Sequence, residues 1–203
     1  MAPSTWFTSD LHLRHRLVAD VRGFASTSAH DEAICSAWWN VVDNEDIVYV
    51  LGDLTVRAHD YALNRIATLP GRKRLILGNH DEAHPMFRSY ERAEAAYRDV
   101  FESVGTHGMR AIDGVDAMLS HFPYDGDSRS DDRGDRHRLR DVGVPVIHGH
   151  THSADQLTRS SKGTLQVHVG LDAHGLALVP EGWIAKALAG ARTSSRTVQR
   201  RDG

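Results

Sequence analysis

Cysteine is nearly absent from this sequence, which contains one such residue among 203. A single cysteine excludes a disulfide framework and a zinc site built on cysteine thiolates. The chain also lacks a strong charge of one sign: its formal net charge is −3, which argues against a basic surface for duplex nucleic acid. No apolar run approaches the roughly 18 residues of a membrane span, and residues 1–10 lack the basic and apolar segments of a signal peptide. These absences predict a cytoplasmic protein with no membrane partner.

Short apolar runs bounded by Gly, Asp, Asn or Pro are typical of buried strands. Such runs cover residues 5–9, 47–51, 75–77, 117–119, 144–147 and 165–169. Between several of them, apolar residues recur with helical periodicity. The predicted helices cover residues 29–42, 61–69 and 85–104. Strands that alternate with helices predict an α/β fold, in a single domain over residues 1–188.

Two segments carry almost no apolar pattern. Residues 125–141 are rich in Asp and Arg, which predicts a surface loop. A lid over a site is the alternative, because long loops in compact domains are often functional. Residues 189–203 contain four Arg and one Asp among small polar residues, and this composition predicts a disordered basic tail.

Polar residues of metal-binding type stand directly after five of the predicted strands. Because ligands of open α/β sheets gather at the carboxyl ends of the strands, these residues are expected to converge in space. In two of the motifs the spacing is two residues, which places both side chains on one side of an extended backbone. The candidate metal ligands are Asp10, His12, Asp53, Asn79, His121, His150 and His152. The pairs with the two-residue spacing are Asp10 with His12 and His150 with His152.

The types of these residues indicate the chemistry. A mixture of carboxylate, imidazole and amide donors suits manganese, iron or zinc better than calcium or magnesium, which prefer oxygen ligands. Seven donors exceed what one four-coordinate ion with an open position needs. They suit two metal ions that share a carboxylate, and Asp53 is the natural bridge. Manganese is the expected metal, with iron or zinc as alternatives.

The motifs resemble, in their order, those of the calcineurin-like metallophosphoesterases, over about residues 6–188. The pattern is similar to that of small bacterial and viral members without a cap domain. The residues that carry the resemblance are Thr8-Ser9-Asp10-Leu11-His12, Gly52-Asp53, Gly78-Asn79-His80-Asp81, Ser120-His121-Phe122-Pro123, Gly149-His150-Thr151-His152 and Val169-Gly170-Leu171-Asp172. It implies a four-layer αββα sandwich, in which two mixed β-sheets are flanked by helices and a dimetal site lies at one edge.

The resemblance also implies how the ligands divide between two metal ions. Asp53 would bridge the ions, and three further ligands would hold each of them. The two groups are Asp10, His12 and His152, then Asn79, His121 and His150. Asp172 and His174 repeat the Asp-x-His spacing, but the resemblance places them in the last sheet region as structural residues rather than ligands.

Four further residues receive expected roles. His80 would remain free of metal beside the leaving oxygen of the substrate, and Asp81 would accept a hydrogen bond that orients it. An N-cap role for Asp81 is the alternative. Arg14 and His15 are candidates for binding the substrate phosphate, and a solvated loop position is their alternative.

The expected reaction is hydrolysis of a small, nucleotide-like phosphodiester, such as a cyclic nucleotide, by in-line attack of a metal-bridging hydroxide. Three other functions stay open: a phosphomonoesterase of the same family, a non-catalytic protein-interaction scaffold on the same fold, and a helical metal phosphohydrolase. The last would carry its ligands on helices and use His80-Asp81 as a ligand pair. The sequence leaves the oligomeric state open.

Overall fold

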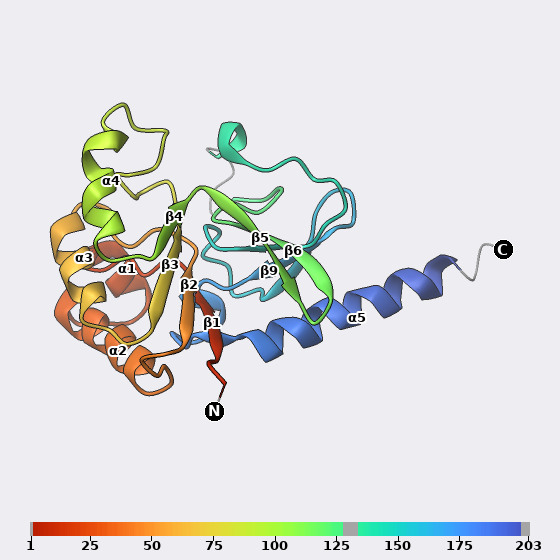
Figure 1. Ribbon diagram of the computed structural model, residues 1–203, viewed down its shortest axis with the longest axis horizontal. Helices are drawn as coiled ribbons and strands as arrows, with labels where there is room; N and C mark the ends of the chain where they lie inside the picture. Colours follow the sequence, from red (N-terminus) through yellow and green to blue (C-terminus); the bar gives the residue numbers. More distant parts are fainter. Residues whose placement is uncertain (1, 128–133, 200–203) are drawn as a thin grey trace.

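Two five-stranded sheets pack against each other in the computed structural model (Figure 1). The structure describes residues 2–127 and 134–199, with side chains as far as residue 190. The strand order is β10-β1-β2-β3-β4 in the first sheet and β5-β6-β7-β9-β8 in the second. Both sheets contain parallel and antiparallel pairs. The predicted α/β class, with two mixed sheets and helices, is confirmed.

The strands and helices have the following bounds. The first sheet contains β1 (Thr5–Thr8), β2 (Ile47–Val50), β3 (Arg72–Ile76), β4 (Ser103–Gly105) and β10 (Val179–Pro180). The second contains β5 (His107–Ile112), β6 (Val115–Ser120), β7 (Val146–His148), β8 (Leu157–Arg159) and β9 (Leu165–His168). The helices are α1 (Arg16–Val21), α2 (Thr27–Trp39), α3 (His59–Ala67), α4 (Tyr90–Arg98) and α5 (Glu181–Gln199), with short 3₁₀ turns η1 (Asp135–His137) and η2 (Leu171–Ala173).

The strands β1 to β4 are parallel because helical segments return the chain between them. The helices α1 to α4 all lie on the same side of the first sheet (Figure 1). In the second sheet, β6, β7 and β9 are also parallel. As a result, the loops that follow β1, β2 and β3 leave one edge of the first sheet, and those that follow β6, β7 and β9 leave one edge of the second.

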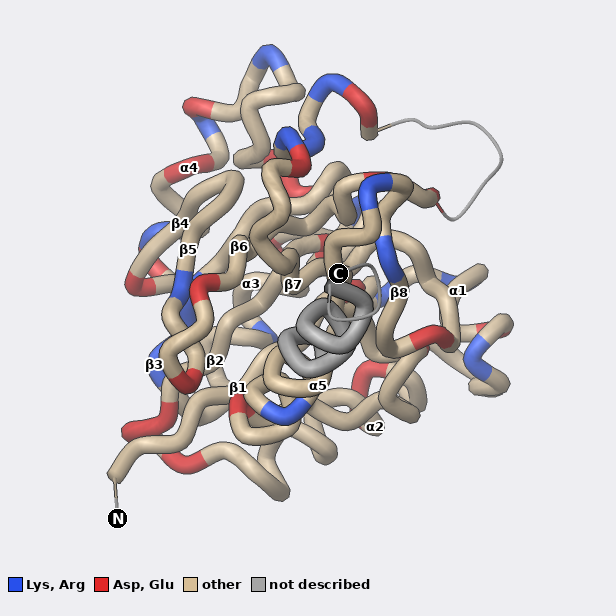
Figure 2. The backbone as a smooth tube through the Cα atoms, turned by 90° about the vertical axis from the view of Figure 1, so that its right-hand side faces the viewer, with Lys and Arg blue, Asp and Glu red and all other residues tan. Residues whose placement is uncertain are grey.

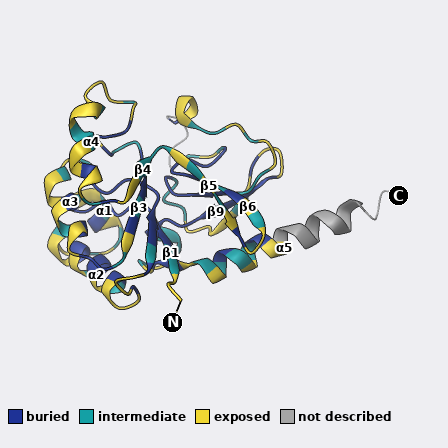
Figure 3. Ribbon diagram, viewed as in Figure 1, coloured by how far each residue is buried: buried dark blue, intermediate teal, exposed yellow. Residues whose placement is uncertain are grey.

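Two hydrophobic clusters hold these layers together. In β2, Val48 and Val50 belong to the cluster between the first sheet and its helices, whereas Tyr49, and Leu51 directly after the strand, belong to the cluster between the two sheets. This alternation follows from the two-residue period of a strand with both faces covered. Trp38 of α2 is fully buried in the first cluster. Figure 3 shows buried strands of the first sheet beside α1 to α4, whose outer faces are exposed.

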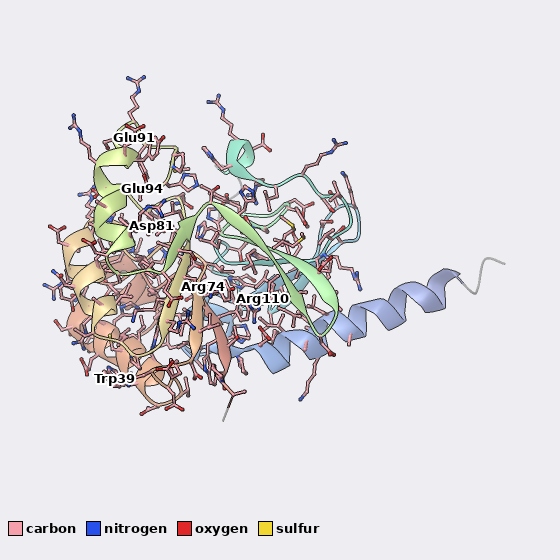
Figure 4. The ribbon with its side chains drawn as sticks, viewed as in Figure 1. Trp39, Arg74, Asp81, Glu91, Glu94 and Arg110 are labelled. Carbon is pink, nitrogen blue, oxygen red and sulfur yellow. The ribbon has the colours of Figure 1, made fainter. Side chains whose placement is uncertain are left out.

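Polar contacts add to the apolar packing between the sheets. The guanidinium groups of Arg74 on β3 and Arg110 on β5 both donate to the hydroxyl of Tyr49, at 2.9 and 3.3 Å (Figure 4). Arg110 also donates to Glu181 of α5 at 2.6 Å. These contacts join β2 and β3 of the first sheet to β5 of the second sheet and to α5.

Each of the six predicted strands is found, with changes at its ends. The prediction of one helix over residues 85–104 was wrong at both ends: α4 covers only Tyr90–Arg98, and residues 103–105 form β4, which pairs with β3. Three residues are too few to show strand alternation, and their pairing depends on the neighbouring strand. The strands β5, β8 and β10 were not predicted either. Within the described part of 125–141, the chain has no strand and no helix besides the short η1, and residues 128–133 lie outside the described residues.

The helix α5 continues to Gln199, and so covers most of the range that the sequence marks as a disordered tail. Leu188 is buried in the cluster between the sheets. The domain boundary at residue 188 and the disorder of residues 189–203 stay predictions. Among the described residues, no helix is both long and apolar enough to cross a membrane. Basic and acidic residues are interspersed along the backbone (Figure 2).

Candidate metal centre

The loops that follow the strands of both sheets meet at one place. The backbone N–H of Asp10 donates to the carbonyl of Gly52 at 3.0 Å, and that of His12 donates to Asp53 at 3.0 Å. The N–H of Gly149 donates to the carbonyl of His121 at 3.0 Å in the same way. The predicted convergence of strand ends is therefore present in the backbone itself. The candidate ligands lie in loops after strands, which excludes the helical metal phosphohydrolase.

Left-handed backbone conformations are concentrated in these loops. Of the eight non-glycine residues with positive φ in the described chain, five are candidate ligands. Their φ values lie between 47 and 70°, and they are Asp10, His12, Asp53, His150 and His152. Such conformations cost about 1–3 kcal/mol each and persist where the surrounding structure enforces them. Their concentration at one place is typical of a functional site.

A close approach of two chains explains the glycine of the Gly-His-x-His motif. A Cβ atom on Gly149 would lie 1.9 Å from Ser9 Oγ and 2.5 Å from Asp10 Oδ2. Only glycine therefore lets the loop after β7 lie against the loop after β1. This contact brings the amide N–H of His150 to 3.0 Å from Asp10 Oδ2, to which it donates.

One group of candidate ligands surrounds His12. The Nε2 atoms of His12 and His152 lie 3.0 Å apart. Asp10 Oδ1 lies 3.9 Å from the first of these nitrogens and 3.8 Å from the second. His12 and Asp10 are buried, whereas the His152 side chain is 30% exposed. Three donor atoms from segments 140 residues apart in the sequence thus face one small volume, as metal ligands do.

A second group surrounds His121. Its Nε2 atom lies 3.2 Å from Asn79 Oδ1 and 3.2 Å from His150 Nδ1. Its Nδ1 atom donates to the carbonyl of Leu51 at 2.7 Å, which leaves Nε2 as the nitrogen with a free lone pair. The structure thus brings together both predicted groups of ligands.

Asp53 lies between the two groups. Its Oδ2 atom is 3.7 Å from His12 Nε2 and 3.6 Å from His121 Nε2. Burial, followed by the charges of Asp10 and Asp81, raises the pKa of Asp53 well above its usual value. Burial also acts to raise the pKa of Asp10, but nearby histidines, led by His152, hold it below its usual value. The centre therefore holds carboxylates that repel one another in the interior.

These donors fit metal ions. Burial lowers the pKa of His12 well below its usual value and, together with His121, lowers that of His150 to about 4, so both imidazoles are neutral at pH 7. Neutral ring nitrogens and carboxylate oxygens that face one another at 3–4 Å repel through their lone pairs unless a cation or a proton lies between them. Cations would offset the buried negative charge. Mixed nitrogen and oxygen donors suit manganese, iron or zinc.

His80 lies at the open side of the centre. Its side chain is 35% exposed, and its Nε2 atom is 4.0 Å from Asp53 Oδ2. Its backbone N–H donates to Asp53 Oδ1 at 2.9 Å, which fixes the start of the turn that carries the ring. The imidazole therefore faces the centre from the solvent side, where a substrate would enter.

The contacts of Asp81 differ from the predicted role of orienting His80. Its carboxylate accepts hydrogen bonds from the backbone N–H groups of Asp53, Leu54 and Gly78, at 3.0, 3.1 and 2.8 Å. Asp81 lies near the end of β3, beneath α4 (Figure 4). Because its two oxygens bind amides of both neighbouring loops, Asp81 holds the loop of Asp53 against that of His80. Orientation of the His80 ring by Asp81 stays a prediction.

Arg14 and His15 lie beside the centre rather than in it. The two rings of His12 and His15 are 5.6 Å apart between centroids. The Arg14 guanidinium lies 4.8 Å from the centroid of the Tyr61 ring, a cation–π geometry. Both residues border a pocket of about 320 Å³ that is also lined by Thr55, Val56, Arg57 and Ala58.

Two carboxylates that contact candidate ligands were not identified as such from the sequence. Asp172 Oδ2 accepts from His152 Nδ1 at 2.8 Å, and Asp127 Oδ2 accepts from His150 Nε2 at 2.9 Å. Asp172 follows β9, and its place at a further strand end was the available signal. Asp127 lies in an Asp-rich and Arg-rich segment, where nothing in the sequence separates it from its neighbours.

His148 lies two residues before the candidate ligand His150 in the sequence, and its side chain is buried in the interior. Its ring stacks on that of His168, with centroids 5.2 Å apart, and its Nδ1 atom donates to the carbonyl of Gly149 at 2.8 Å. Burial, followed by the charge of His168, lowers the pKa of His148 to about 3. It is therefore neutral in the folded protein, as expected of a core histidine.

This burial predicts a loss of stability in acid. The unfolded chain binds a proton at His148 near pH 6.5, whereas the folded chain binds it only near pH 3, so stability falls between these values as pH decreases. The expected contribution is about 1.4 kcal/mol per pH unit. We expect urea unfolding of the metal-stripped protein at pH 7.5 and 5.5 to show a smaller acid loss in His148→Gln than in wild type, by about 1 kcal/mol. Equal losses in both proteins would contradict the prediction.

This chain is similar to known proteins over most of its length. The sequence profile of the calcineurin-like phosphoesterase superfamily domain matches residues 6–175. The Gene 66 protein of Mycobacterium phage L5 is 44% identical over 183 residues, which cover 85% of this chain and 88% of the phage protein. The Gene 66 protein of Mycobacterium phage D29 is 43% identical over 179 residues, with coverages of 84% and 88%.

A solved structure supports the fold alone. A protein of unknown function from Aquifex aeolicus superposes on 91% of this chain and 99% of its own length, with a TM-score of 0.69 and 22% sequence identity.

The sandwich of two mixed sheets, with clusters of candidate metal ligands at its strand ends, is typical of a metallophosphoesterase fold. The profile match extends over most of the chain, and the protein belongs to the calcineurin-like phosphoesterase superfamily. Members of this superfamily act on phosphoesters and typically bind a dinuclear metal centre.

Proposed function

We propose that this protein is a dimetal-dependent phosphodiesterase that hydrolyses small phosphodiesters such as cyclic nucleotides, in the cytoplasm. The observation that carries the proposal is the position of Asp53, whose Oδ2 atom lies 3.7 and 3.6 Å from ring nitrogens of two separate ligand groups. A carboxylate in this position can hold two ions at once. A pair of ions suits in-line displacement at phosphorus, because it offsets charge on both the attacking and the leaving oxygen.

The ligands of the proposed centre would divide as the family resemblance implies, with Asp53 shared between the ions. The two groups are Asp10, His12 and His152, then Asn79, His121 and His150. Two bound ions would neutralise the phosphate and activate water for attack; manganese is proposed, with iron or zinc as alternatives.

His80 has the position of a proton donor or hydrogen-bond donor to the substrate. Its ring lies at the solvent side of the centre and is 35% exposed, so a substrate can reach it. A protonated imidazole there would stabilise charge on the phosphoryl group, or give a proton to the departing oxygen. In this proposal His80 supplies the acid and activated water is the nucleophile, so no serine or cysteine nucleophile is needed.

The pocket beside His15 suits the remainder of a nucleotide-like substrate. Its volume of about 320 Å³ falls at the low end of small-molecule sites. Arg14 and Arg57 line it and favour an anion. The backbone N–H of Arg14 donates to Asp31 Oδ1 at 3.1 Å, which anchors the loop that presents the guanidinium.

Assays of model substrates test the proposal. Metal-stripped protein is reconstituted with manganese, iron or zinc and supplied with bis-p-nitrophenyl phosphate or p-nitrophenyl phosphate. Metal-dependent turnover that favours the diester supports a phosphodiesterase, and a screen of cyclic nucleotides would then define the substrate. A preference for the monoester would show instead that the protein is a phosphomonoesterase. Two bound ions without turnover of either substrate would favour the interaction scaffold.

Replacement of Arg14 with alanine is expected to raise KM about tenfold, with little change in kcat, because a lost contact to a charged group of the substrate costs roughly 1.4 kcal/mol. Steady-state kinetics with the best cyclic nucleotide measure this effect. Arg16→Ala is the matched control, since Arg16 is an exposed arginine nearby that pairs with Asp20. An unchanged KM in Arg14→Ala would exclude Arg14 from substrate binding.

A further inference from the structure

Each of the two histidines of the His150-x-His152 motif donates a hydrogen bond to a carboxylate, and that carboxylate is paired with an arginine. We propose that Arg22–Asp172–His152 and Arg138–Asp127–His150 are two positioning relays, one for each metal ion. The inference rests on the proposed dimetal centre, and assigns to residues outside it the task of setting the metal affinity of each half.

The first relay is built into the fold. Asp172 Oδ2 accepts from His152 Nδ1 at 2.8 Å. Arg22 donates to the same carboxylate through Nε and Nη2, both at 2.8 Å, in a bidentate pair whose Arg22 side chain is 5% exposed. Both carboxylate oxygens of Asp172 thus accept from a guanidinium, which is always charged, and this pairing favours the ionised carboxylate. The carboxylate is therefore ionised, and His152 must be the donor.

Arg22 also links the first relay to the opposite end of the chain. Its Nη2 atom donates to the carbonyl of Asp10 at 2.9 Å. The Arg22 guanidinium, 150 residues from Asp172 in the sequence, thus connects the loop of Asp10 to the turn of Asp172. Because Asp10 and His152 belong to the same group of ligands, Arg22 fixes their relative position.

The second relay lies on the loop that follows β6. Asp127 Oδ2 accepts from His150 Nε2 at 2.9 Å and lies 3.5 Å from Arg138 Nη2. The side chains of Asp127 and Arg138 are 2% and 5% exposed. Arg138 also donates to the carbonyls of Pro123 and Gly126, at 2.8 and 2.9 Å, and so closes the loop around Asp127.

The relays act on opposite nitrogens of the two rings. In His152 the bond to Asp172 occupies Nδ1 and leaves Nε2 facing His12, at 3.0 Å. In His150 the bond to Asp127 occupies Nε2 and leaves Nδ1 facing His121, at 3.2 Å. Each carboxylate therefore fixes the tautomer that presents a lone pair to the centre, and makes that nitrogen a stronger donor.

Metal titration tests the relays separately from catalysis. Manganese is titrated into metal-stripped wild type, Asp172→Asn and Asp127→Asn against a chromophoric chelator. We expect wild type to bind two ions, and each variant to bind one of them 10–100-fold more weakly while the other ion is unaffected. Electron paramagnetic resonance gives a second readout. At a manganese concentration that fills both sites of the wild type, the wild type should give the signal of two coupled ions, and each variant should give that of a single ion.

Asp46→Asn is the matched control, because Asp46 is also a buried carboxylate and accepts from Ser4, Trp6 and Asp43 at the start of β2, away from the centre. It is expected to lower stability without changing either affinity. Should Asp172→Asn fail to fold, Asp172→Glu and Asp127→Asn carry the same test, with Glu expected to retain part of the lost affinity.

The outcomes separate this inference from the proposed function. Two ions bound with unchanged affinity in both variants would overturn the relays and leave the dimetal centre intact. Fewer than two ions in wild type would instead overturn the dimetal centre itself, and the relays with it. Equal weakening by the control variant would reduce the effect to general stability.

Discussion

His80→Ala is expected to lower turnover by about 100- to 10,000-fold, the range that a positioned acid or base contributes. The ring of His80 faces the centre from the solvent side, with its Nε2 atom 4.0 Å from Asp53 Oδ2. It belongs to neither ligand group, so metal content should stay near two ions per chain. Steady-state kinetics and elemental analysis of the same preparation measure both quantities.

The control for His80→Ala is His107→Ala, which removes an exposed histidine at the start of β5. It should retain wild-type turnover and metal content. If His80→Ala turns over at the wild-type rate, the catalytic role of His80 is wrong. If it loses a metal ion along with its activity, His80 acts in metal binding instead.

Asp53→Asn is expected to abolish turnover, by at least roughly 1,000-fold, because several kcal/mol of charge stabilisation disappears when the ions are not held. Asn keeps the shape of the side chain and can still accept from the backbone N–H of His80, which donates to Asp53 Oδ1 at 2.9 Å. It removes the charge that lies between His12 and His121. Metal analysis should therefore find fewer than two ions per chain.

The same substitution is expected to change stability with opposite signs in the two states of the protein. Burial and the neighbouring carboxylates raise the pKa of Asp53, so the metal-free wild type loses stability as pH rises and this carboxyl ionises. Asp53→Asn should therefore raise the free energy of unfolding of the metal-free protein at pH 8, by about 1–3 kcal/mol. With saturating manganese it should lower it, because bound ions stabilise the wild type more.

Urea unfolding with and without manganese measures this reversal. Asp46→Asn serves again as control and should destabilise both states, because its carboxylate accepts three hydrogen bonds and has no part in the centre. Destabilisation of the metal-free protein by Asp53→Asn would mean that the carboxylate is well solvated or paired without metal, contrary to the geometry described.

Local patterns were sufficient for much of the fold. Residues 47–51 are apolar on both faces of a strand, and residues 165–169 are apolar on one face; both runs proved to be largely buried strands. The short strand β4 was instead assigned to a helix, and β5, β8 and β10 were not predicted. These strands lie at or next to sheet edges, where pairing with a neighbour, rather than an apolar run, decides the conformation.

The candidate ligands were also accessible from the sequence, because each follows an apolar run and strand ends of one direction share an edge. Asp81 shows the limit of that reasoning. Its neighbour in sequence, His80, suggested an orienting role, but its oxygens accept from amides of Asp53, Leu54 and Gly78. Which of several nearby donors a carboxylate binds depends on how two loops pack.

The sequence by itself therefore determined the chemistry of the centre: which residue types converge, and at which ends of the strands. Only the tertiary structure decided how those residues are held. The left-handed backbone at Asp10 and His150, the contact at Gly149 and the pairing of Asp172 with Arg22 all depend on segments distant in the chain. The physical reason is that the buried strands inside each sheet follow from local side-chain pattern, whereas edge strands and hydrogen-bond partners across 20 to 150 residues exist only once the chain has packed together.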